Sequence, residues 1–276
     1  MDITTISKPD FEESMPVGMS SHEEIYESVK PALDEMLSSV RSSILGDEGE
    51  TMLQGADPES ILARNFKKVV SISAFLSVLR QLDLVLTPSG FGVVSNDNIA
   101  PASQSRVDAL EASLRTEGIK AKAQLLYNLR SDKWGKTSQA ARQIPFLYDE
   151  YYFFLEGRSS NLQEKDWNAF NPTIQRVDEY IRSLISDNQM DAMLTSFRCN
   201  DQTLPAYGNA ISEIRRITDM VAADKHEILK TTCRRLLQIL NSDPDNFSEY
   251  FSSLEYKANN HETYKNTPDK TAFVFG

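Results

Sequence analysis

The most apolar helical run of the chain is Asp57 to Leu86, DPESILARNFKKVVSISAFLSVLRQLDLVL. Its apolar residues recur at steps of three and four and cover more than one face, which indicates a helix buried on most sides. Asp57 followed by Pro58 predicts where the helix begins, with the aspartate as N-cap and the proline at the first helical position. The turn-forming run TPSG (87–90) predicts its end. We therefore expect a central helix over 57–86.

Helical periodicity continues on both sides of this segment. Ser21 and Glu24 form a capping-box pattern at the head of an amphipathic run that reaches about Leu45. The acidic, glycine-rich run from Gly46 to Ser60 is expected to be a mobile loop. Further helices are predicted from Ser105, with Gly118 as a point of bending or splitting, past Asn171-Pro172, over about 208–240 with a break near 222–225, and over 247–257.

These patterns predict a mostly α protein, a bundle of roughly six to eight helices with at most a small β element. The β element is expected near Phe91 to Val94 and at the C-terminal tail. The organisation expected is a flexible, extended N-terminal arm over 1–19, a helical domain over 20–257 and a tail over 258–276. The domain could subdivide near 131–171 or near 198–207, where the pattern is less regular and where the run with Pro205 is typical of a linker.

Aromatic residues crowd together between Ser131 and Asn171. Packing in the core is the first interpretation, and an aromatic-rich contact between subunits is the second, because aromatic side chains are enriched in both places. Both interpretations stay open. The residues are Phe146, Tyr148, Tyr151, Tyr152, Phe153, Phe154, Trp167 and Phe170.

Two segments are candidates for contact with a partner. The first, SGFGVVSNDNIAPASQS (89–105), is an apolar, glycine-punctuated loop between two helical runs, and such loops are often placed by a rigid scaffold for binding. The same apolar residues would also suit a buried loop. The second, the terminal AFVFG, either folds back as a strand or docks on another chain. The interaction residues predicted are Phe91, Val93, Val94, Asn96, Asn98, Ile99, Phe273, Val274 and Phe275.

Charge and composition exclude several classes of function. The net charge of −11 repels nucleic acid, so sequence-specific nucleic-acid binding is not expected. No apolar run approaches a membrane span and the first residues do not resemble a signal peptide, so we expect a protein made in the cytoplasm with no membrane contact. The two cysteines, Cys199 and Cys233, lie far apart in the sequence and indicate neither a disulfide framework nor a zinc site.

None of the sequence's apparent catalytic or ligand-binding motifs is complete. Gly135-Lys136-Thr137 is like the end of a phosphate-binding loop, yet the glycine required five positions earlier is Arg130. His226-Glu227 begins a zinc-binding HExxH pattern, but Lys230 stands in place of the second histidine. We therefore predict no catalytic, metal-binding or cofactor-binding residues, and no enzyme.

The string LTPSGFGVVSNDNIAPASQSRVDAL (86–110) resembles a stretch of uncharacterised bacteriophage and prophage proteins that are regarded as similar to head–tail connectors. The resemblance is best over about 61–130. It implies a non-enzymatic virion structural protein that assembles with itself and with portal or tail proteins, as a homo-oligomeric ring on assembly and as a monomer in isolation. The virion would then be its final location. The alternative is a monomeric helical adaptor or regulatory protein that binds one protein partner.

Overall fold

The computed structural model describes residues 5–15, 23–82, 84–87, 90–93, 103–156 and 162–260. These residues form helices α1 to α12 and one two-stranded sheet, which confirms the mostly α fold with a small β element. The described chain divides into two compact units. Unit 1 takes in the residues up to Pro172 together with Thr195–Asp201, and unit 2 takes in Thr173–Leu194 and the residues from Gln202 onward.

Among its described residues, unit 1 contains six complete α-helices, four short helical turns and parts of two helices that it shares with unit 2. The α-helices are α1 (Lys8–Ser14), α2 (Glu23–Val40), α3 (Gly46–Gln54), α4 (Ile61–Val78), α5 (Gln104–Leu129) and α6 (Ser138–Gln143). The turns are the π-helical η1 (Arg41–Leu45) and η4 (Tyr152–Glu156) and the 3-10 turns η2 (Leu79–Gln81) and η3 (Trp134–Lys136).

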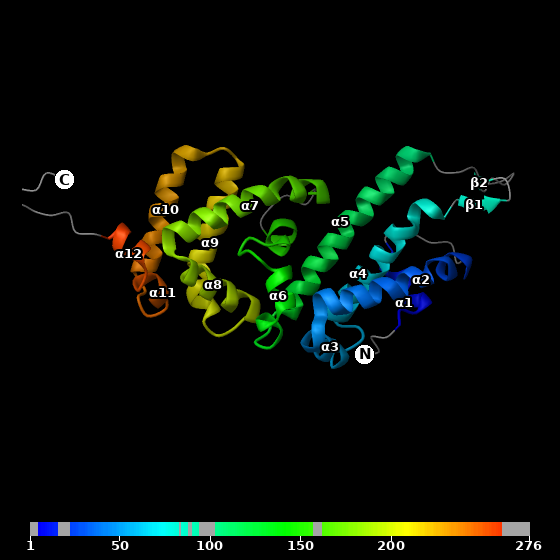
Figure 1. The fold of residues 1–276 in the computed structure, drawn as a ribbon, viewed down its shortest axis with the longest axis horizontal. Coiled ribbons are helices and arrows are strands. Elements are labelled where there is room, and N and C mark those ends of the chain that lie inside the picture. Colours follow the sequence, from blue (N-terminus) through cyan, green and yellow to red (C-terminus); the bar gives the residue numbers. More distant parts are fainter. Residues whose placement is uncertain are drawn as a thin grey trace, which may run out of the picture. The chain divides into compact units, whose positions relative to one another are not determined.

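Helix α4 is the centre of unit 1, as its sequence predicted. It packs against α1, α2 and α5 (Figure 1). Helix α5 runs without a break through Gly118, where a Cβ atom would lie 3.1 Å from Ile72 Cγ2, so the glycine allows the two helices to approach closely rather than bending α5. The side chains that α4 buries are Ala63, Phe66, Val69, Val70, Ser71, Ile72, Ala74 and Phe75.

Both predicted ends of the central helix were wrong. The Asp57 carboxylate accepts a hydrogen bond from the Glu59 backbone N–H at 2.8 Å, which forms a local turn in place of a helix N-cap. The N-cap is Ser60, whose hydroxyl accepts from the backbone N–H of Ala63. At the other end α4 stops at Val78, because the residues that follow form η2 and then a strand.

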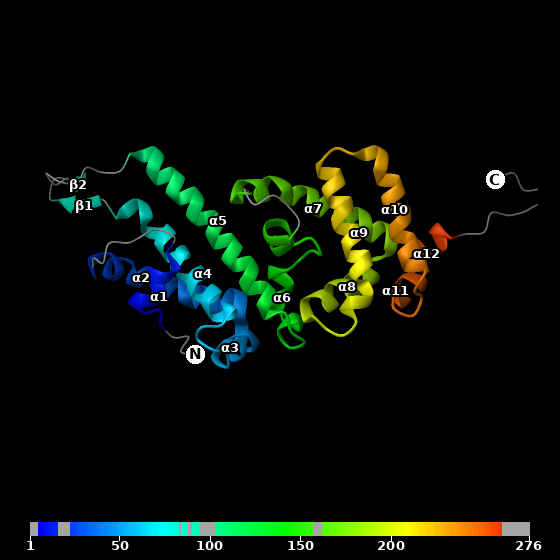
Figure 2. The same ribbon diagram turned by 180° about the vertical axis from the view of Figure 1, so that it is seen from behind.

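The β element is a hairpin of β1 (Leu84–Thr87) and β2 (Gly90–Val93), paired antiparallel with Leu84 opposite Val93. Strand β2 lies one residue before the strand expected at 91–94, whereas β1 occupies the predicted end of the central helix. A run of β-branched and leucine residues this short fits a strand as well as a helix, so pairing with β2 decides its conformation. The hairpin lies beyond the ends of α4 and α5 (Figures 1 and 2).

The predicted extended arm contains helix α1. Ser7 and Asp10 form a capping box at its start. Phe11 is buried, with its ring centroid 6.0 Å from that of Tyr26 on α2 and 6.3 Å from that of Phe75 on α4. Residues 8–14 therefore belong to the core of unit 1.

The prediction of a mobile loop over 46–60 was also wrong for most of that range, because residues 46–54 form α3. Its sequence, GDEGETMLQ, contains two glycines and is a weak helix former. Tertiary packing stabilises this helix despite its weak propensity, since Leu53 is fully buried and Gly49 lies against the side chains of Trp134 and Leu45.

Several of the aromatic residues between 131 and 171 lie in the core of unit 1, and the others are half-buried. Tyr148, Phe153, Phe154 and Phe170 are buried, and their rings contact one another at centroid distances of about 5 Å. Helix α7 (Glu164–Ile185) begins before the predicted Asn171-Pro172 boundary and carries Pro172 inside it. Proline removes one backbone hydrogen bond from a helix, and the boundary between the two units falls directly after it.

We expect Glu150→Gln to raise the stability of unit 1 above neutral pH and to have no such effect in acid. Burial raises the pKa of Glu150, whose Oε2 has no hydrogen-bond partner among the described residues, while Lys122 Nζ lies 3.3 Å from Oε1. Because the folded chain holds the proton more tightly than the unfolded chain, native stability falls as pH rises through the folded pKa.

Urea unfolding at about pH 4 and about pH 8 measures this difference. Glu35→Gln, at an exposed position on α2, is the control and should leave the pH dependence of stability unchanged. An equal loss of stability for Glu150→Gln at both pH values would contradict the prediction.

Unit 2 consists of the rest of α7 together with α8 (Asp187–Cys199) up to Leu194, α9 (Leu204–Ala222), α10 (His226–Asn241), α11 (Ser248–Phe251) and α12 (Leu254–Asn259). Helices α9 and α10 pack against each other, and the break predicted near 222–225 is confirmed. Two hydrogen bonds attach the last helices to the unit. Gln189 Oε1 accepts from the Tyr250 backbone N–H at 3.0 Å, and Asn259 Nδ2 donates to the Leu184 carbonyl at 2.8 Å.

The predicted linker over 198–207 is shorter than expected. Helix α8 ends at Cys199 and α9 begins at Leu204, so four residues connect them. The helix predicted over 247–257 is two short helices, α11 and α12. The tail residues from 261 onward lie outside the described part of the chain.

Candidate functional site

Helix α2 ends in the π-helical turn η1, and the sequence of this turn explains its conformation. The hydroxyls of Ser42 and Ser43 both donate to the Ser39 carbonyl, at 3.1 and 2.7 Å. Serine hydroxyls compete in this way with the regular helical hydrogen bonds. The chain then turns at Gly46, with φ +57° and ψ −173°, a conformation that essentially only glycine adopts. Single π-turns of this kind are frequent at functional sites.

Side chains from a distant segment cap this helix end. Trp134 Nε1 donates to the Ile44 carbonyl at 3.0 Å, Gln139 Nε2 donates to the Ser42 carbonyl at 3.4 Å, and Gln143 Nε2 donates to the Ser43 carbonyl at 3.2 Å. The last carbonyls of a helix have no donor within the helix, so they need partners from elsewhere. Residues 134–143 therefore act as a C-cap for three successive carbonyls, and we call them the cap segment.

The cap segment is held from its other side by the last turn of α8. Arg198 Nε donates to the Ile144 carbonyl at 2.8 Å. Gly135 lies directly against the backbone of Arg198 and Cys199, where a Cβ atom would be only 2.6 Å from backbone atoms. These contacts, all within unit 1, fix the position of the segment that caps η1.

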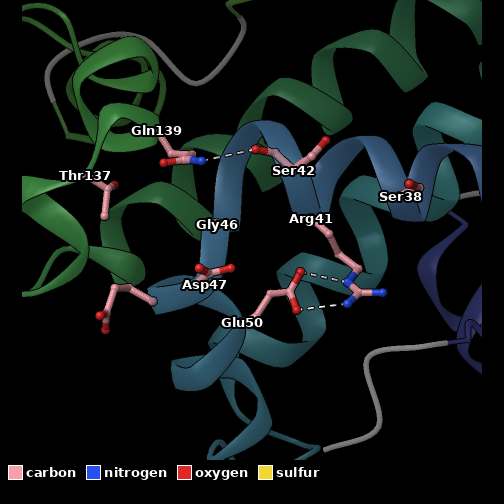
Figure 3. Close-up of a pocket in the computed structure, with 9 residues that line it drawn as sticks. Ser38, Arg41, Ser42, Gly46, Asp47, Glu50, Thr137 and Gln139 are labelled. Carbon is pink, nitrogen blue, oxygen red and sulfur yellow. Dashed lines mark hydrogen bonds and ion pairs between the residues drawn. The ribbon is translucent and has the colours of Figure 1, made fainter.

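A pocket of about 660 Å³ opens where η1, α3 and the cap segment meet (Figure 3). The Arg41 guanidinium and the Glu50 carboxylate form two hydrogen bonds of 2.9 Å across it, and the pKa of Arg41 is raised chiefly by its hydrogen bond to Glu50. One arginine and three carboxylates leave the lining with a net formal charge of −2. The pocket is lined by Ser38, Arg41, Ser42, Gly46, Asp47, Glu48, Glu50, Thr137 and Gln139.

The chemistry available in this pocket is hydrogen bonding and ion pairing. The described lining includes no histidine or cysteine. The hydroxyls of Ser42 and Thr137 donate to backbone carbonyls and are not paired with a base. Asp47 and Glu48 stand in the first turn of α3, where the helix dipole stabilises negative charge. The arrangement therefore fits a structural or binding role.

Two of the nine predicted interaction residues lie within the described part of the chain. Phe91 and Val93 lie in strand β2. Val94, Asn96, Asn98 and Ile99, and the tail residues Phe273, Val274 and Phe275, lie outside the described residues. At the end of the 89–105 segment, residues 103–105 are described and exposed.

The residues of the pocket were not identified from the sequence. Gly46 and the acidic residues after it were assigned to a mobile loop. Gln139 and Gln143 are surface-type residues, and no local pattern links them to carbonyls about a hundred positions earlier. The one available signal was Gly46 directly after an amphipathic helix, because glycine at that position commonly ends a helix.

The described residues contain no group of three or more histidine, cysteine, aspartate or glutamate side chains that could hold a metal ion. Among the helices that the structure describes, none is long and apolar enough to cross a membrane.

Fold and pocket together define a mostly helical module with a β-hairpin between α4 and α5 and a capped π-turn. Residues 21–144 match the model of a family of unknown function, DUF6712. The matched range reaches from the start of α2 to the end of α6 and so includes the hairpin, the π-turn and the cap segment. Neither curated proteins nor solved structures give a match to the chain.

Proposed function

We propose that this chain is a non-enzymatic structural protein of a bacteriophage or prophage virion, similar to head–tail connectors. It is made in the cytoplasm and assembles with copies of itself and with portal or tail proteins, as a ring in the virion. The resemblance of residues 86–110 to phage proteins is the observation that carries this proposal. The chemistry of the pocket supports it, since hydrogen bonds and ion pairs serve binding.

The position of the resembling segment adds support. It runs from β1 through β2 into α5, at the end of the packed helix pair α4 and α5 (Figure 2). Within the described residues β1 pairs only with β2, and neither strand carries a charged residue. Uncharged edges of a small sheet suit the addition of a strand from a partner. A hairpin carried by two long helices is well placed for contact with a neighbouring subunit.

The test is the mass of the purified protein in light scattering over a wide concentration range, followed by negative-stain images of the most concentrated sample. Rings or other large symmetric oligomers are the expected result, in the protein alone or after the portal protein is added. A protein that stays monomeric with the portal protein and forms a one-to-one complex with one unrelated protein would favour the alternative, a helical adaptor.

Removing residues 261–276 should abolish assembly and leave the helical fold intact. The cut falls after Asn260, so every described helix is retained, including α12. Circular dichroism and urea unfolding measure the fold, while light scattering measures assembly. Removing residues 5–15, which takes away the buried Phe11, is the control for a loss of assembly that comes from damage to the core. If the chain without 261–276 still assembles, the tail has no part in assembly.

A further inference from the structure

We infer that α3, residues 46–54, is a hinged flap over the pocket, held closed by the Arg41–Glu50 ion pair. The flap joins the rest of unit 1 through a glycine at each end, Gly46 and Gly55. Its opening would separate Asp47, Glu48 and Glu50 from the opposite wall, which η1 and the cap segment form. The inference rests on the geometry of unit 1 and not on the proposed function in assembly.

The two ends of α3 are suited to act as hinges. Gly46 has a backbone conformation that other residues rarely adopt, and hinges are a few terminal residues of an element that absorb changes in φ and ψ. Gly55 is exposed, and a Cβ atom there would meet only backbone oxygens of α3 itself, at 3.6 Å or more. The connection that follows, 56–59, is mostly exposed.

Few side chains hold α3 in place. Of its nine residues only Gly49 and Leu53 are buried, whereas α4 buries eight of eighteen. Met52 adds one weak contact, as its sulfur accepts a hydrogen bond from the Ser131 hydroxyl at 3.3 Å. Elements with few buried apolar contacts open locally at a lower free energy than the elements of the core.

The hydrogen bonds that position the wall opposite the flap do not involve α3, although Trp134 of this wall packs against Gly49 of α3. The cap segment binds the carbonyls of Ser42, Ser43 and Ile44, and none of these three hydrogen bonds involves an α3 residue. Arg41 belongs to this fixed wall and Glu50 to the flap, so their two hydrogen bonds cross the hinge at Gly46 (Figure 3). Opening the flap breaks this ion pair and leaves the cap of α2 in place.

Hydrogen–deuterium exchange of the full chain, read by mass spectrometry, tests the inference. In the native protein, backbone amides in the second half of α3 should exchange faster than those of α2 and α4, because they open without unfolding of unit 1. Glu50→Gln keeps the shape of the side chain and removes its charge. It should speed exchange in α3 by about fivefold and leave α2 and α4 unchanged, as expected for loss of a partly exposed ion pair.

Glu48→Gln is the matched control, since it removes a carboxylate from the same helix and the same pocket without touching Arg41. It should change exchange in α3 by less than about twofold. Two results would overturn the inference. One is that, in the unmodified protein, amides of α3 exchange as slowly as those of α4. The other is an equal effect of Glu48→Gln and Glu50→Gln, or a rise that spreads over all helices of unit 1.

Discussion

Replacing Trp134 with alanine is expected to lower the free energy of unfolding of unit 1 by about 3–5 kcal/mol. Trp134 is completely buried, so the change removes a large apolar side chain and leaves a cavity beside Gly49 and η1. It also removes the donor to the Ile44 carbonyl. Trp167, the second of the two tryptophans in the chain, lies in the same unit and remains as a fluorescent reporter for urea unfolding.

Trp134→Phe separates the two contributions to this loss. Phenylalanine retains most of the apolar contact but has no N–H, so the expected loss is about 1–3 kcal/mol, close to the cost of one unsatisfied carbonyl and a small void. A loss below about 1 kcal/mol for Trp134→Ala would show that the buried position and the cap hydrogen bond do not stabilise unit 1.

Gly135→Ala is expected to destabilise unit 1 by about 3 kcal/mol, the upper part of the range for overpacking. Its Cβ would lie 2.6 Å from the carbonyl carbon and oxygen of Arg198 and from the nitrogen of Cys199. These are backbone atoms of the last turn of α8, which cannot rotate away as the end of a long side chain can. Relief of the contact requires the cap segment to move, with loss of its hydrogen bonds to η1. Urea unfolding with tryptophan fluorescence measures the effect.

Gly208→Ala is the matched control, with the opposite sign. Gly208 lies inside α9, and a Cβ atom there meets nothing within 4 Å. Alanine should therefore stabilise unit 2 by up to about 1 kcal/mol through its higher helix propensity, measured by the unfolding of the helical circular dichroism signal. If both glycine variants change stability by the same amount, the close approach at Gly135 is not the cause of its effect.

Local sequence patterns correctly predicted the elements whose hydrophobic pattern matches their burial in the structure. The apolar periodicity of 57–86 correctly placed the central helix of unit 1, although it missed the turn at Asp57 and the strand at Leu84. Glycine residues beside β-branched residues predicted strand β2, and a polar interruption predicted the break between α9 and α10. Both signals act over only a few residues. Hydrophobicity predicted the aromatic cluster, and the structure buries four of its eight residues, Tyr148, Phe153, Phe154 and Phe170, in the core of unit 1.

Spacings of three and four apolar residues were enough to predict the mostly α class, the central helix of unit 1 and most of the other helices. The helices at 8–14 and 46–54 depend on tertiary packing, since Phe11 and Leu53 stabilise weak helices by burial against distant residues. The tertiary structure alone showed the pocket, where Gln139, Gln143 and Trp134 meet carbonyls 90 or more positions away. Tertiary packing brings such partners together, so a local sequence pattern cannot predict these contacts.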